Sequence, residues 1–505
     1  MNNKVKTILG NGNVGQNVIV DVECYMSNNL PNIVIVGFAS KSVDEAKERI
    51  RGALSSSKIK LPRKRITINL APADIPKQGS SFDLAMALSI MQAAGMFGGR
   101  TGDSIVIGEL GLDGEVRPVR GIIGKILSAK KAGYKSFIIP AKNMSQAKLI
   151  PNINLLSIKN LQQIYEKLQS AELNFKKNNT SQATQQDRIE DKYQELFENI
   201  TGQEAAKRAM LIAAAGHHNI FLSGPPGTGK SMLAKALISI MPPMNNNEML
   251  ETTHLHSLAN QNFDKIITTR PVRSPHHSSS QVSIIGGGSN PKPGEISLSH
   301  HGVLFFDEFP EFNRSVIESL RQPLEDRRIT IARAKDSIDF PANFILVATA
   351  NPCPCGNYNT ELECTCLLNS IIRYQKRISG PVIDRIDLYV DVDRVDHTKL
   401  LKYQSNNEKS IDLRSKVAMV RKQQINRQEK LNSQLSNSEL KNQSRLTEDA
   451  RQLFNRAAGQ MNLSARGYMR TLRVANTIAD LNQNKYIASS EISEALQYRK
   501  KTIEL

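Results

Sequence analysis

The sequence predicts an α/β protein of several domains, built around a glycine-rich loop. Strand-like apolar runs alternate with helix-like segments over much of the 505 residues, a pattern typical of sheets covered by helices. Residues 224–231 read GPPGTGKS, which fills every required position of the pattern G-x-x-x-x-G-K-[ST]. A chain of this length corresponds to about three domains.

The glycine-rich loop has the flanks that this motif requires. It follows the apolar run 219–222 and precedes the apolar-periodic stretch 232–237. Its glycines let the backbone curl so that N–H groups point at phosphate oxygens. We expect Lys230 to reach the β- and γ-phosphates of ATP and the Ser231 hydroxyl to hold Mg²⁺. The residues predicted to bind ATP are Gly224, Pro225, Pro226, Gly227, Thr228, Gly229, Lys230 and Ser231.

The charge balance points to a polyanionic partner. Lysine and arginine number 66 against 48 aspartates and glutamates, a formal net charge of +18. A basic surface without a partner is the alternative, but such an excess favours DNA or RNA. The sequence contains no run of about 18 apolar residues, so we expect no membrane span. The first residues lack the pattern of a secretory signal. The five cysteines, an odd number, favour a reducing cytoplasm.

Composition divides the chain into four parts. Residues 1–168 alternate between strand and helix patterns, and the polar stretch 169–188 has the character of a linker. Residues 189–395 form the predicted nucleotide-binding α/β domain, and 396–505 are helical. In the first part we expect strands at 32–37, 65–70 and 136–140, helices at 42–57, 82–94 and 121–133, and a hairpin of 105–110 with 115–119 around the turn 111–114.

Polar residues follow two further apolar runs. Asp307 and Glu308 end the run that begins at Val303; a helix cap is the alternative, but downstream of a phosphate loop they fit an ATPase better. Asp307 would then hold Mg²⁺, and Glu308 would orient and deprotonate the attacking water. Asn351 ends the run 344–350 and would place that water or sense the γ-phosphate, unless it is a turn residue. Arg385 is either a surface charge or an arginine finger for a neighbouring subunit.

Four cysteines form two C-x-C pairs separated by eight residues. Four thiolates can make a closed, tetrahedral structural zinc site. The usual spacing is C-x₂₋₄-C, so free or redox-active thiols are the alternative. The predicted zinc ligands are Cys353, Cys355, Cys364 and Cys366.

The order of these motifs resembles that of AAA+ ATPases, in particular the magnesium-chelatase-type branch and its ComM/YifB family. The stretches that carry the resemblance are 270–312, 320–334, 348–356, 378–388 and 463–481. The resemblance implies an AAA+ core with a C-terminal helical lid. It also implies that Asn351 is sensor 1, that Arg385 is the finger, and that 200–203 lies near adenine. Arg466 matches sensor 2, a lid residue that contacts the γ-phosphate, although Arg470 and Arg473 lie on the same helix.

The family is similar to helicases of the minichromosome-maintenance type, which carry two insertions in the ATPase core. One falls at about 282–298 and contains Lys292; the other is a hairpin in which Arg333 and Lys335 share a face. The resemblance implies that these three residues contact DNA without reading its sequence, and that the protein is a hexamer. An ordinary charged hairpin is the alternative.

The first part of the chain resembles the Lon-type protease domain, which has a ribosomal S5 domain 2-like fold. The resemblance lies in 77–84 and 108–140. Ser81 falls at the place of the nucleophile, but the place of the lysine base falls on Ile123, with Lys125 two residues away. An aliphatic side chain cannot take a proton, so we expect this domain to be non-proteolytic.

Three functions are compatible with these patterns. The first, implied by the ComM/YifB resemblance, is an ATP-driven DNA translocase that acts as a branch-migration helicase in recombination during natural transformation. The second is a magnesium-chelatase-type ATPase that remodels a protein partner. The third is an ATP-dependent protease, against which Ile123 speaks.

Overall fold

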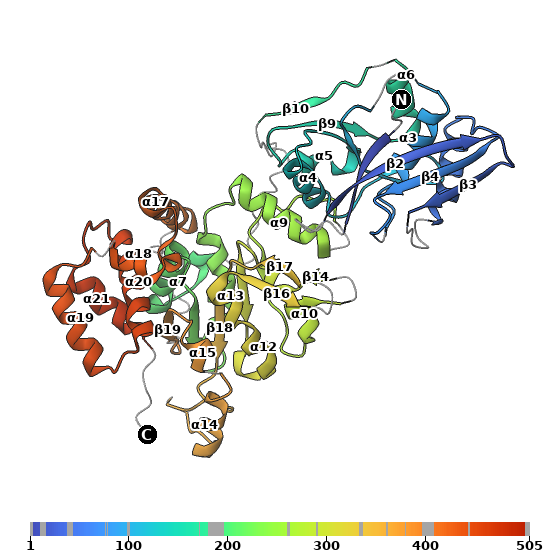
Figure 1. Cartoon of the computed structure of the whole chain (residues 1–505). Helices are drawn as coiled ribbons and strands as arrows, with labels where there is room; N and C mark the ends of the chain where they lie inside the picture. The colour runs from blue at the N-terminus through green and yellow to red at the C-terminus, as the bar shows by residue number, and fades with distance from the viewer. Residues whose placement is uncertain are drawn as a thin grey trace. The chain divides into compact units, whose positions relative to one another are not determined.

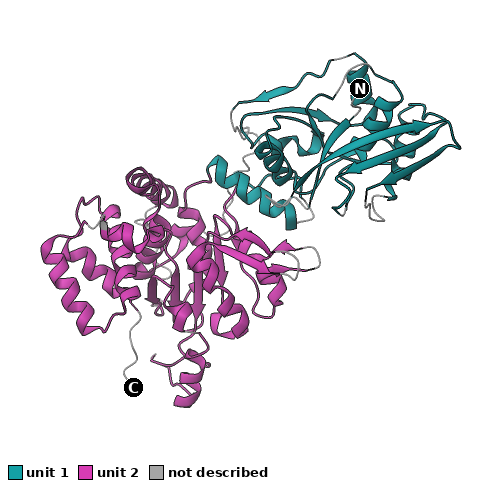
Figure 2. Cartoon of the chain, in the orientation of Figure 1, with its two compact units in different colours: residues 1–189, 245–268 teal, residues 190–244, 269–505 magenta. Residues whose placement is uncertain are grey.

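The computed structural model divides the chain into two compact units (Figure 2). Unit 1 comprises residues 1–189 and 245–268, and unit 2 comprises 190–244 and 269–505. Each unit has an α/β architecture of its own. The structure describes residues 4–10, 17–37, 44–75, 77, 79–97, 101–170, 172–179, 196–259, 263–288, 291–332, 337–359, 362–378, 380–395, 409–442 and 445–499.

Unit 1 is built on an eight-stranded mixed sheet in the order β10-β9-β8-β5-β1-β2-β4-β3 (Figure 1). Along β4 the side chains of Ile66, Ile68 and Leu70 are buried and their neighbours are more exposed, as the two-residue period of a strand requires. The strands are β1 (Lys4–Leu9), β2 (Val18–Ser27), β3 (Asn32–Val36), β4 (Arg65–Ala71), β5 (Ile105–Val106), β8 (Ser136–Pro140), β9 (Ile153–Ile158) and β10 (Lys176–Asn178).

The helices of unit 1 confirm the pattern expected for this part of the chain. Nine residues of α3 are buried, as expected for a helix that is apolar on nearly every side. The predicted turn at 111–114 joins the short strands β6 (Glu109–Leu110) and β7 (Val116–Arg117), which pair antiparallel. The helices are α2 (Ala46–Ser56), α3 (Asp83–Ala93), α4 (Ile122–Lys131), α5 (Met144–Ala147) and α6 (Leu161–Gln169).

Two segments lie in unit 1 that the sequence did not place there. Within the stretch 169–188, β10 pairs antiparallel with β9, so the sheet extends beyond residue 168. The helix α9 (Asn246–Ala259) follows the phosphate-loop region in sequence, yet it packs against α4. Arg120 donates a hydrogen bond to the backbone oxygen of Leu258 at 3.2 Å. The domain boundaries drawn from composition stay a prediction.

Unit 2 is built on a five-stranded parallel sheet in the order β12-β15-β18-β11-β19. The phosphate loop follows β11, the acidic pair follows β15, and Asn351 follows β18. Parallel strands bring these three segments to one edge, where open α/β sheets bind their ligands. The strands are β11 (Ile220–Ser223), β12 (Val272–Arg273), β15 (Val303–Phe306), β18 (Ile345–Ala350) and β19 (Leu388–Asp391).

Two small antiparallel hairpins and a set of short helices complete the α/β part of unit 2. The hairpins are β13 (Gly286–Gly287) with β14 (Lys292–Pro293), and β16 (Arg328–Ala332) with β17 (Ser337–Pro341). The helices are α7 (Glu204–Gly216), α8 (Lys230–Ala236), α10 (Gln281–Ile285), α11 (Glu295–Leu298), α12 (Arg314–Ser319), α13 (Arg321–Asp326), α14 (Leu368–Gln375) and α15 (Gly380–Ile383).

The C-terminal region of unit 2 is helical, as predicted. One continuous apolar cluster contains α7, the buried strand residues of β11, and residues of α17 and α20, so this lid shares its core with the α/β part. The lid helices are α17 (Ser410–Gln428), α18 (Asn437–Asn442), α19 (Glu448–Gln460), α20 (Ala465–Leu481) and α21 (Ser489–Gln497). Among the described residues, no helix is long and apolar enough to cross a membrane.

Candidate active site

The phosphate loop wraps around the side chain of Lys230. Its Nζ donates hydrogen bonds to the backbone oxygens of Gly224 and Pro225, both at 2.7 Å. Burial lowers the pKa of Lys230, and the nearby carboxylates of Asp307 and Glu308 oppose that shift. A compact cation held by carbonyl groups at a loop of this kind can exchange those carbonyls for phosphate oxygens.

Glycine is required at two places in the loop. Gly229, at the start of α8, has a φ of +87°, which L side chains rarely adopt. A Cβ at Gly224 would lie 2.2 Å from the backbone oxygen of Val392, so only glycine lets the loop pass this close to the chain after β19. The Thr228 hydroxyl donates to the Pro225 backbone oxygen at 3.0 Å and closes the loop.

The candidate magnesium ligands already touch. The Ser231 hydroxyl donates to Oδ2 of Asp307 at 2.9 Å, and the Thr349 hydroxyl donates to Oδ1 of the same carboxylate at 2.6 Å. Hydroxyl and carboxylate oxygens are the hard ligands that Mg²⁺ prefers, so these residues fit the ion. Thr349, which the sequence did not single out, thus orients Asp307 from the neighbouring strand.

Glu308 and Asn351 flank this pair. Glu308 is exposed and has a left-handed backbone, with a φ of +52°; its N–H donates to the Thr349 hydroxyl at 3.1 Å. A non-glycine residue in this conformation is uncommon and is often found at functional sites. Asn351 accepts a hydrogen bond from Nζ of Lys230 at 3.4 Å, so the predicted sensor lies beside the predicted phosphate-binding lysine.

The segment expected near adenine is tied to the same loop. Gln203 donates to the backbone oxygen of Thr228 at 3.3 Å and to that of Asp393 at 2.6 Å. Its own backbone is left-handed, with a φ of +60°. One side chain therefore holds 200–203 against both the phosphate loop and the residues after β19.

The arginines form a second cluster. Arg385 pairs with Glu325 of α13 and donates to the Pro381 backbone oxygen at 2.6 Å. Arg385, Arg466 and Arg470 all lower the pKa of Glu325, with the Arg385 hydrogen bond as the largest cause, so the lid arginines lie near the predicted finger. Among the contacts described for Arg385, none is with the phosphate loop.

The contacts of the three lid arginines distinguish them. Arg470 is paired with Asp387, with Nη1 2.9 Å from Oδ1. Arg473 donates to the Leu435 backbone oxygen at 2.9 Å and to Asn437 at 2.7 Å, so both side chains serve contacts within the unit. Arg466 is exposed near the start of α20. Of the three lid arginines, Arg466 is thus the one whose side chain is exposed, and its match to sensor 2 stays a prediction.

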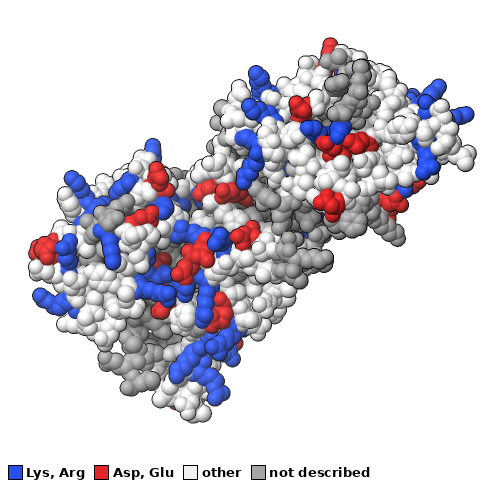
Figure 3. Space-filling model, in the orientation of Figure 1, with Lys and Arg blue, Asp and Glu red and all other residues white. Residues whose placement is uncertain are grey.

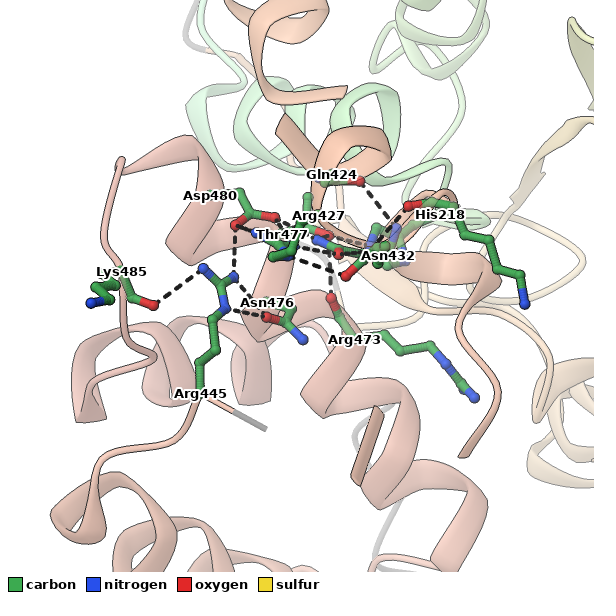
Figure 4. Close-up of polar contacts among 12 residues, drawn as sticks. His218, Gln424, Arg427, Asn432, Arg445, Arg473, Asn476, Thr477, Asp480 and Lys485 are labelled. Carbon is green, nitrogen blue, oxygen red and sulfur yellow. Dashed lines mark hydrogen bonds and ion pairs between the residues drawn. The ribbon is translucent and has the colours of Figure 1, made fainter. Parts of the chain in front are cut away.

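A buried polar network joins His218 to the lid, and Figure 4 shows its members from His218 to Asp480. His218 is fully buried, and its Nε2 lies 2.7 Å from the Thr477 hydroxyl. Its Nδ1 lies 3.4 Å from Oδ2 of Asp387. Asn432 donates to Thr477 at 3.1 Å and to Asp480 at 2.8 Å. This network could not be predicted from the sequence, because its members are far apart in the chain and follow no motif.

Arginines enclose the far end of this network. Arg427 and Arg445 each approach Oδ1 of Asp480, at 2.8 and 2.7 Å. Burial would raise the pKa of Asp480, but these two guanidinium groups and Asn432 lower it below its ordinary value. A buried carboxylate with two cations and an amide is satisfied on all sides, so the network holds the lid helices in one arrangement.

Asn219, directly before β11, joins residues 380–387 to the sheet; we call these residues the finger segment after the role predicted for Arg385. Its backbone N–H donates to Oδ2 of Asp387 at 3.1 Å, and its side-chain nitrogen donates to the Arg385 backbone oxygen at 3.3 Å. Its side-chain oxygen accepts the N–H of Leu346 at 2.9 Å. The residue before the strand that leads into the phosphate loop therefore holds the segment that carries Arg385.

The predicted DNA-contacting residues are partly described. Lys292 is exposed on β14, opposite Gly287. The predicted hairpin around 328–335 exists as β16 and β17. Arg333 and Lys335 belong to 333–336, between these strands, which lies outside the described residues.

A basic groove beside α14 was not predicted. It has a volume of about 760 Å³, and its lining includes Arg314, Arg373, Lys376 and Arg377. Figure 3 shows lysine and arginine side chains gathered over the region of α14. Arg377 is neutralised by Glu311 at 2.6 Å. The sequence signal was the short run 373–377, RYQKR, which on its own is typical of a solvated helix end.

The four predicted zinc ligands come together. The Sγ atoms of Cys353, Cys355 and Cys364 are 3.3 to 3.8 Å apart, and Cys366 belongs to the same cluster. All five cysteines are free, and these separations exceed the roughly 2.05 Å of a disulfide bond.

In unit 1, the position at which Lon-type proteases carry their lysine base is occupied by an apolar residue, Ile123. Ile123 is fully buried in a cluster with Ile8, Ile105 and Phe137. Lys125 is also buried, and its Nζ donates to the Gly10 backbone oxygen at 2.5 Å. Burial lowers the pKa of Lys125 to about 8. Ser81 has an exposed fraction of 8%, so the expected nucleophile is enclosed as well.

Comparisons with known proteins agree with these observations. The magnesium chelatase subunit ChlI family matches residues 196–400, a family described as subunit ChlI of Mg-chelatase matches 22–143, and the ChlI C-terminal family matches 407–499. The chain is 39% identical to the competence protein ComM of Haemophilus influenzae over 497 residues, covering 95% of this chain and 94% of that protein.

Two other relatives cover most of the chain and a short part of it, respectively. The YifB protein of Escherichia coli is 37% identical over 482 residues, with 95% of this chain and 94% of that protein covered. The Lon protease of Helicobacter pylori is 36% identical over 98 residues, which are 18% of this chain and 12% of that protein. With its phosphate loop, parallel sheet, helical lid and Lon-like first unit, this chain belongs to the ComM/YifB family of magnesium-chelatase-like AAA+ ATPases.

Proposed function

We propose that the protein hydrolyses ATP at a site shared between neighbouring subunits of a ring. The family's resemblance to helicases implies that this ring is a hexamer. The observation that carries the proposal is the meeting of Lys230, Ser231, Asp307 and Asn351 at the carboxyl edge of the parallel sheet. Lys230 would bind the β- and γ-phosphates, and Glu308 would orient the attacking water and accept its proton. Ser231 and Asp307 would hold Mg²⁺, which neutralises phosphate charge when bound.

The neighbouring subunit would complete this site. Arg385 is engaged with Glu325 rather than with its own phosphate loop. A finger that reaches an adjacent subunit would stabilise charge on the transferred phosphoryl group. Because Arg466 lies near Arg385 and Glu325, we propose that the sensor 2 arginine approaches the same neighbouring nucleotide.

We further propose that the energy of hydrolysis moves DNA. The net charge of +18 favours a polyanion. Lys292 lies on the hairpin of β13 and β14, and Arg333 and Lys335 fall in sequence between β16 and β17. Backbone contacts of this kind do not depend on sequence, as branch migration during recombination in natural transformation requires. The relative named competence protein fits this role. The proposal places the protein in the cytoplasm, which supplies ATP and keeps thiols reduced.

A DNA-stimulated ATPase assay tests the DNA role. We expect forked or four-way DNA to raise ATP turnover, and the stimulation and affinity to fall steeply between about 50 and 200 mM salt. The variant Arg333→Ala/Lys335→Ala should lose stimulation while keeping basal turnover. Arg373→Ala/Lys376→Ala tests the basic groove beside α14 in the same way. Turnover that ignores DNA at every salt concentration contradicts the proposal.

The second candidate is a magnesium-chelatase-type ATPase that remodels a protein. The names of the matching families favour it. It predicts that turnover is stimulated by a protein partner and is unchanged by DNA, so the same assay with both additions separates the two functions. The protease function has no base at Ile123, and we do not propose it.

A further inference from the structure

The loop between β18 and α14 brings four thiols to one point. The Sγ atoms of Cys353, Cys355, Cys364 and Cys366 all lie within 4.8 Å of one another, and three of the pairs are 3.3, 3.8 and 3.6 Å apart. A tetrahedral zinc site with Zn–S bonds of about 2.3 Å has sulfur atoms about 3.8 Å apart. The observed spacing is thus close to that of a loaded site.

Apolar packing does not account for this convergence. Among the described residues of 351–367, none belongs to a helix or a strand, and loops of this length without secondary structure are uncommon in compact domains unless they are functional. Leu362 and Leu367 are 46% and 77% exposed, whereas Cys353 is fully buried. The N–H of Tyr358 donates to Sγ of Cys353 at 3.3 Å, the kind of outer contact that supports a thiolate ligand.

We infer that these four cysteines bind one Zn²⁺ ion. We also infer that the ion, by ordering the loop that carries the cysteines, stabilises the nucleotide site against which this loop packs. Four sulfur ligands select a soft metal over Mg²⁺ and leave no open position for a substrate. The ion is therefore structural.

Two contacts connect the cysteine loop to the nucleotide site. The loop begins directly after Asn351, the partner of Lys230, and Gln375 of α14 donates to the Pro352 backbone oxygen at 3.0 Å. Gly356, between the two cysteine pairs, has a φ of +84°, and a Cβ there would lie 2.5 Å from Cδ of Pro226. The loop thus lies against the phosphate loop at Gly356 and continues directly from Asn351, the predicted sensor 1. This coupling rests on the proposed ATPase function.

Metal analysis of the full chain, purified without exposure to oxygen, tests the ion itself. We expect about one zinc per chain in the wild type and in Cys24→Ser, whose thiol belongs to unit 1, and almost none in Cys364→Ser/Cys366→Ser. Cobalt loaded in place of zinc should show the visible and charge-transfer bands of a tetrahedral thiolate site. Far less than one zinc in the wild type, with no cobalt bands, overturns the inference whatever the ATPase activity.

A second measurement tests the coupling. Gly356→Ala keeps all four ligands but places a methyl group against Pro226, so it should retain zinc while ATP turnover falls about tenfold or more. Gly133→Ala, at a φ of +94° with open space around it, controls for backbone strain and should keep normal turnover. If Gly356→Ala retains both zinc and full turnover, the ion does not act on the nucleotide site. A wild type with zinc but no DNA stimulation would count against the DNA role alone.

Discussion

Arg470 of α20 and Asp387 of the finger segment form a buried ion pair, with Nη1 2.9 Å from Oδ1 and side chains 18% and 5% exposed. Burial would raise the pKa of Asp387, but Arg470, His218 and the N–H of Asn219 outweigh it and lower the pKa below its ordinary value. The lid and the finger segment therefore share one ionised carboxylate. An arginine that the sequence offered as a sensor holds the two parts of the unit together.

Replacing that carboxylate should loosen the lid. Asp387→Asn leaves the Arg470 guanidinium without its counter-charge, and breaking one partner of a buried pair costs about 3 to 5 kcal/mol. We expect a lower midpoint in thermal or urea unfolding of unit 2. A signal from the lid helices is used to monitor this unfolding. Asp384→Asn, at an exposed position of the same segment, is the matched control. Equal midpoints for the two variants would show that the pair does not stabilise the lid.

Arg385→Ala should assemble normally and lose ATP turnover by about 10³-fold, the effect known for removal of an arginine finger. Mixing it with Lys230→Ala subunits should restore part of the turnover, because some interfaces then combine an intact loop with an intact finger. Turnover of mixtures across all ratios is the measurement. Arg456→Ala, on the exposed side of α19, should behave as wild type. Full turnover by Arg385→Ala as a monomer would disprove action in trans.

Glu308→Gln should bind ATP with near-normal affinity and lose hydrolysis by about 10²- to 10⁴-fold, the usual contribution of a general base. The amide keeps the shape of the side chain but cannot accept the proton of water. Nucleotide binding by fluorescence and single-turnover hydrolysis measure the two steps separately. Glu311→Gln, three residues along the same segment, should retain hydrolysis. Loss of binding in Glu308→Gln would instead indicate a structural role for the carboxylate.

Lys125 should make the stability of unit 1 depend on alkaline pH. Its pKa is lowered to about 8 by burial, whereas an unfolded lysine has a pKa of about 10.4. Between these values the unfolded chain binds a proton that the folded unit does not, so stability rises with pH. Relative to Lys125→Met, the free energy of unfolding of the wild type should rise by about 3 kcal/mol at most between pH 7.5 and 10.5.

The test is denaturant unfolding of the wild type and Lys125→Met across that pH range. Lys131→Met, at an exposed position of the same helix α4, should follow the wild type in parallel. Parallel curves for the wild type and Lys125→Met would show that the buried amine keeps its proton over this range.

The parts of the site that could be predicted are those whose residues form short, local sequence patterns. The phosphate loop needs its glycines and lysine at fixed spacing, and Asp307 and Asn351 each end an apolar strand, so the edge where they meet followed from the strand pattern. The elements of unit 1 followed likewise from their two- and 3.6-residue periods. Ser231 and Asp307, the residues predicted to hold Mg²⁺, are hydrogen-bonded at 2.9 Å.

The rest depends on contacts between distant residues. Thr349 and His218 have no local pattern that sets them apart, and His218 meets Thr477 across 259 residues. The strand β10 is polar, and its position at a sheet edge, beside β9, gave no apolar period to detect. The resemblance matched Arg466 to sensor 2 without excluding Arg470, and the Asp387 contact of Arg470 could not be read from the sequence.

The three hydrogen bonds of Asn219 bear on how the proposed ATPase would coordinate its subunits. Its backbone N–H and its side-chain nitrogen donate to the finger segment, and its side-chain oxygen accepts from the central strand β18, immediately before the strand that enters the phosphate loop. A shift caused by one subunit's own nucleotide would therefore reach the arginine that it offers to the next. In the proposed ring, ATP hydrolysis would then proceed sequentially from one subunit to the next, with the side chain of Asn219 as the link between them.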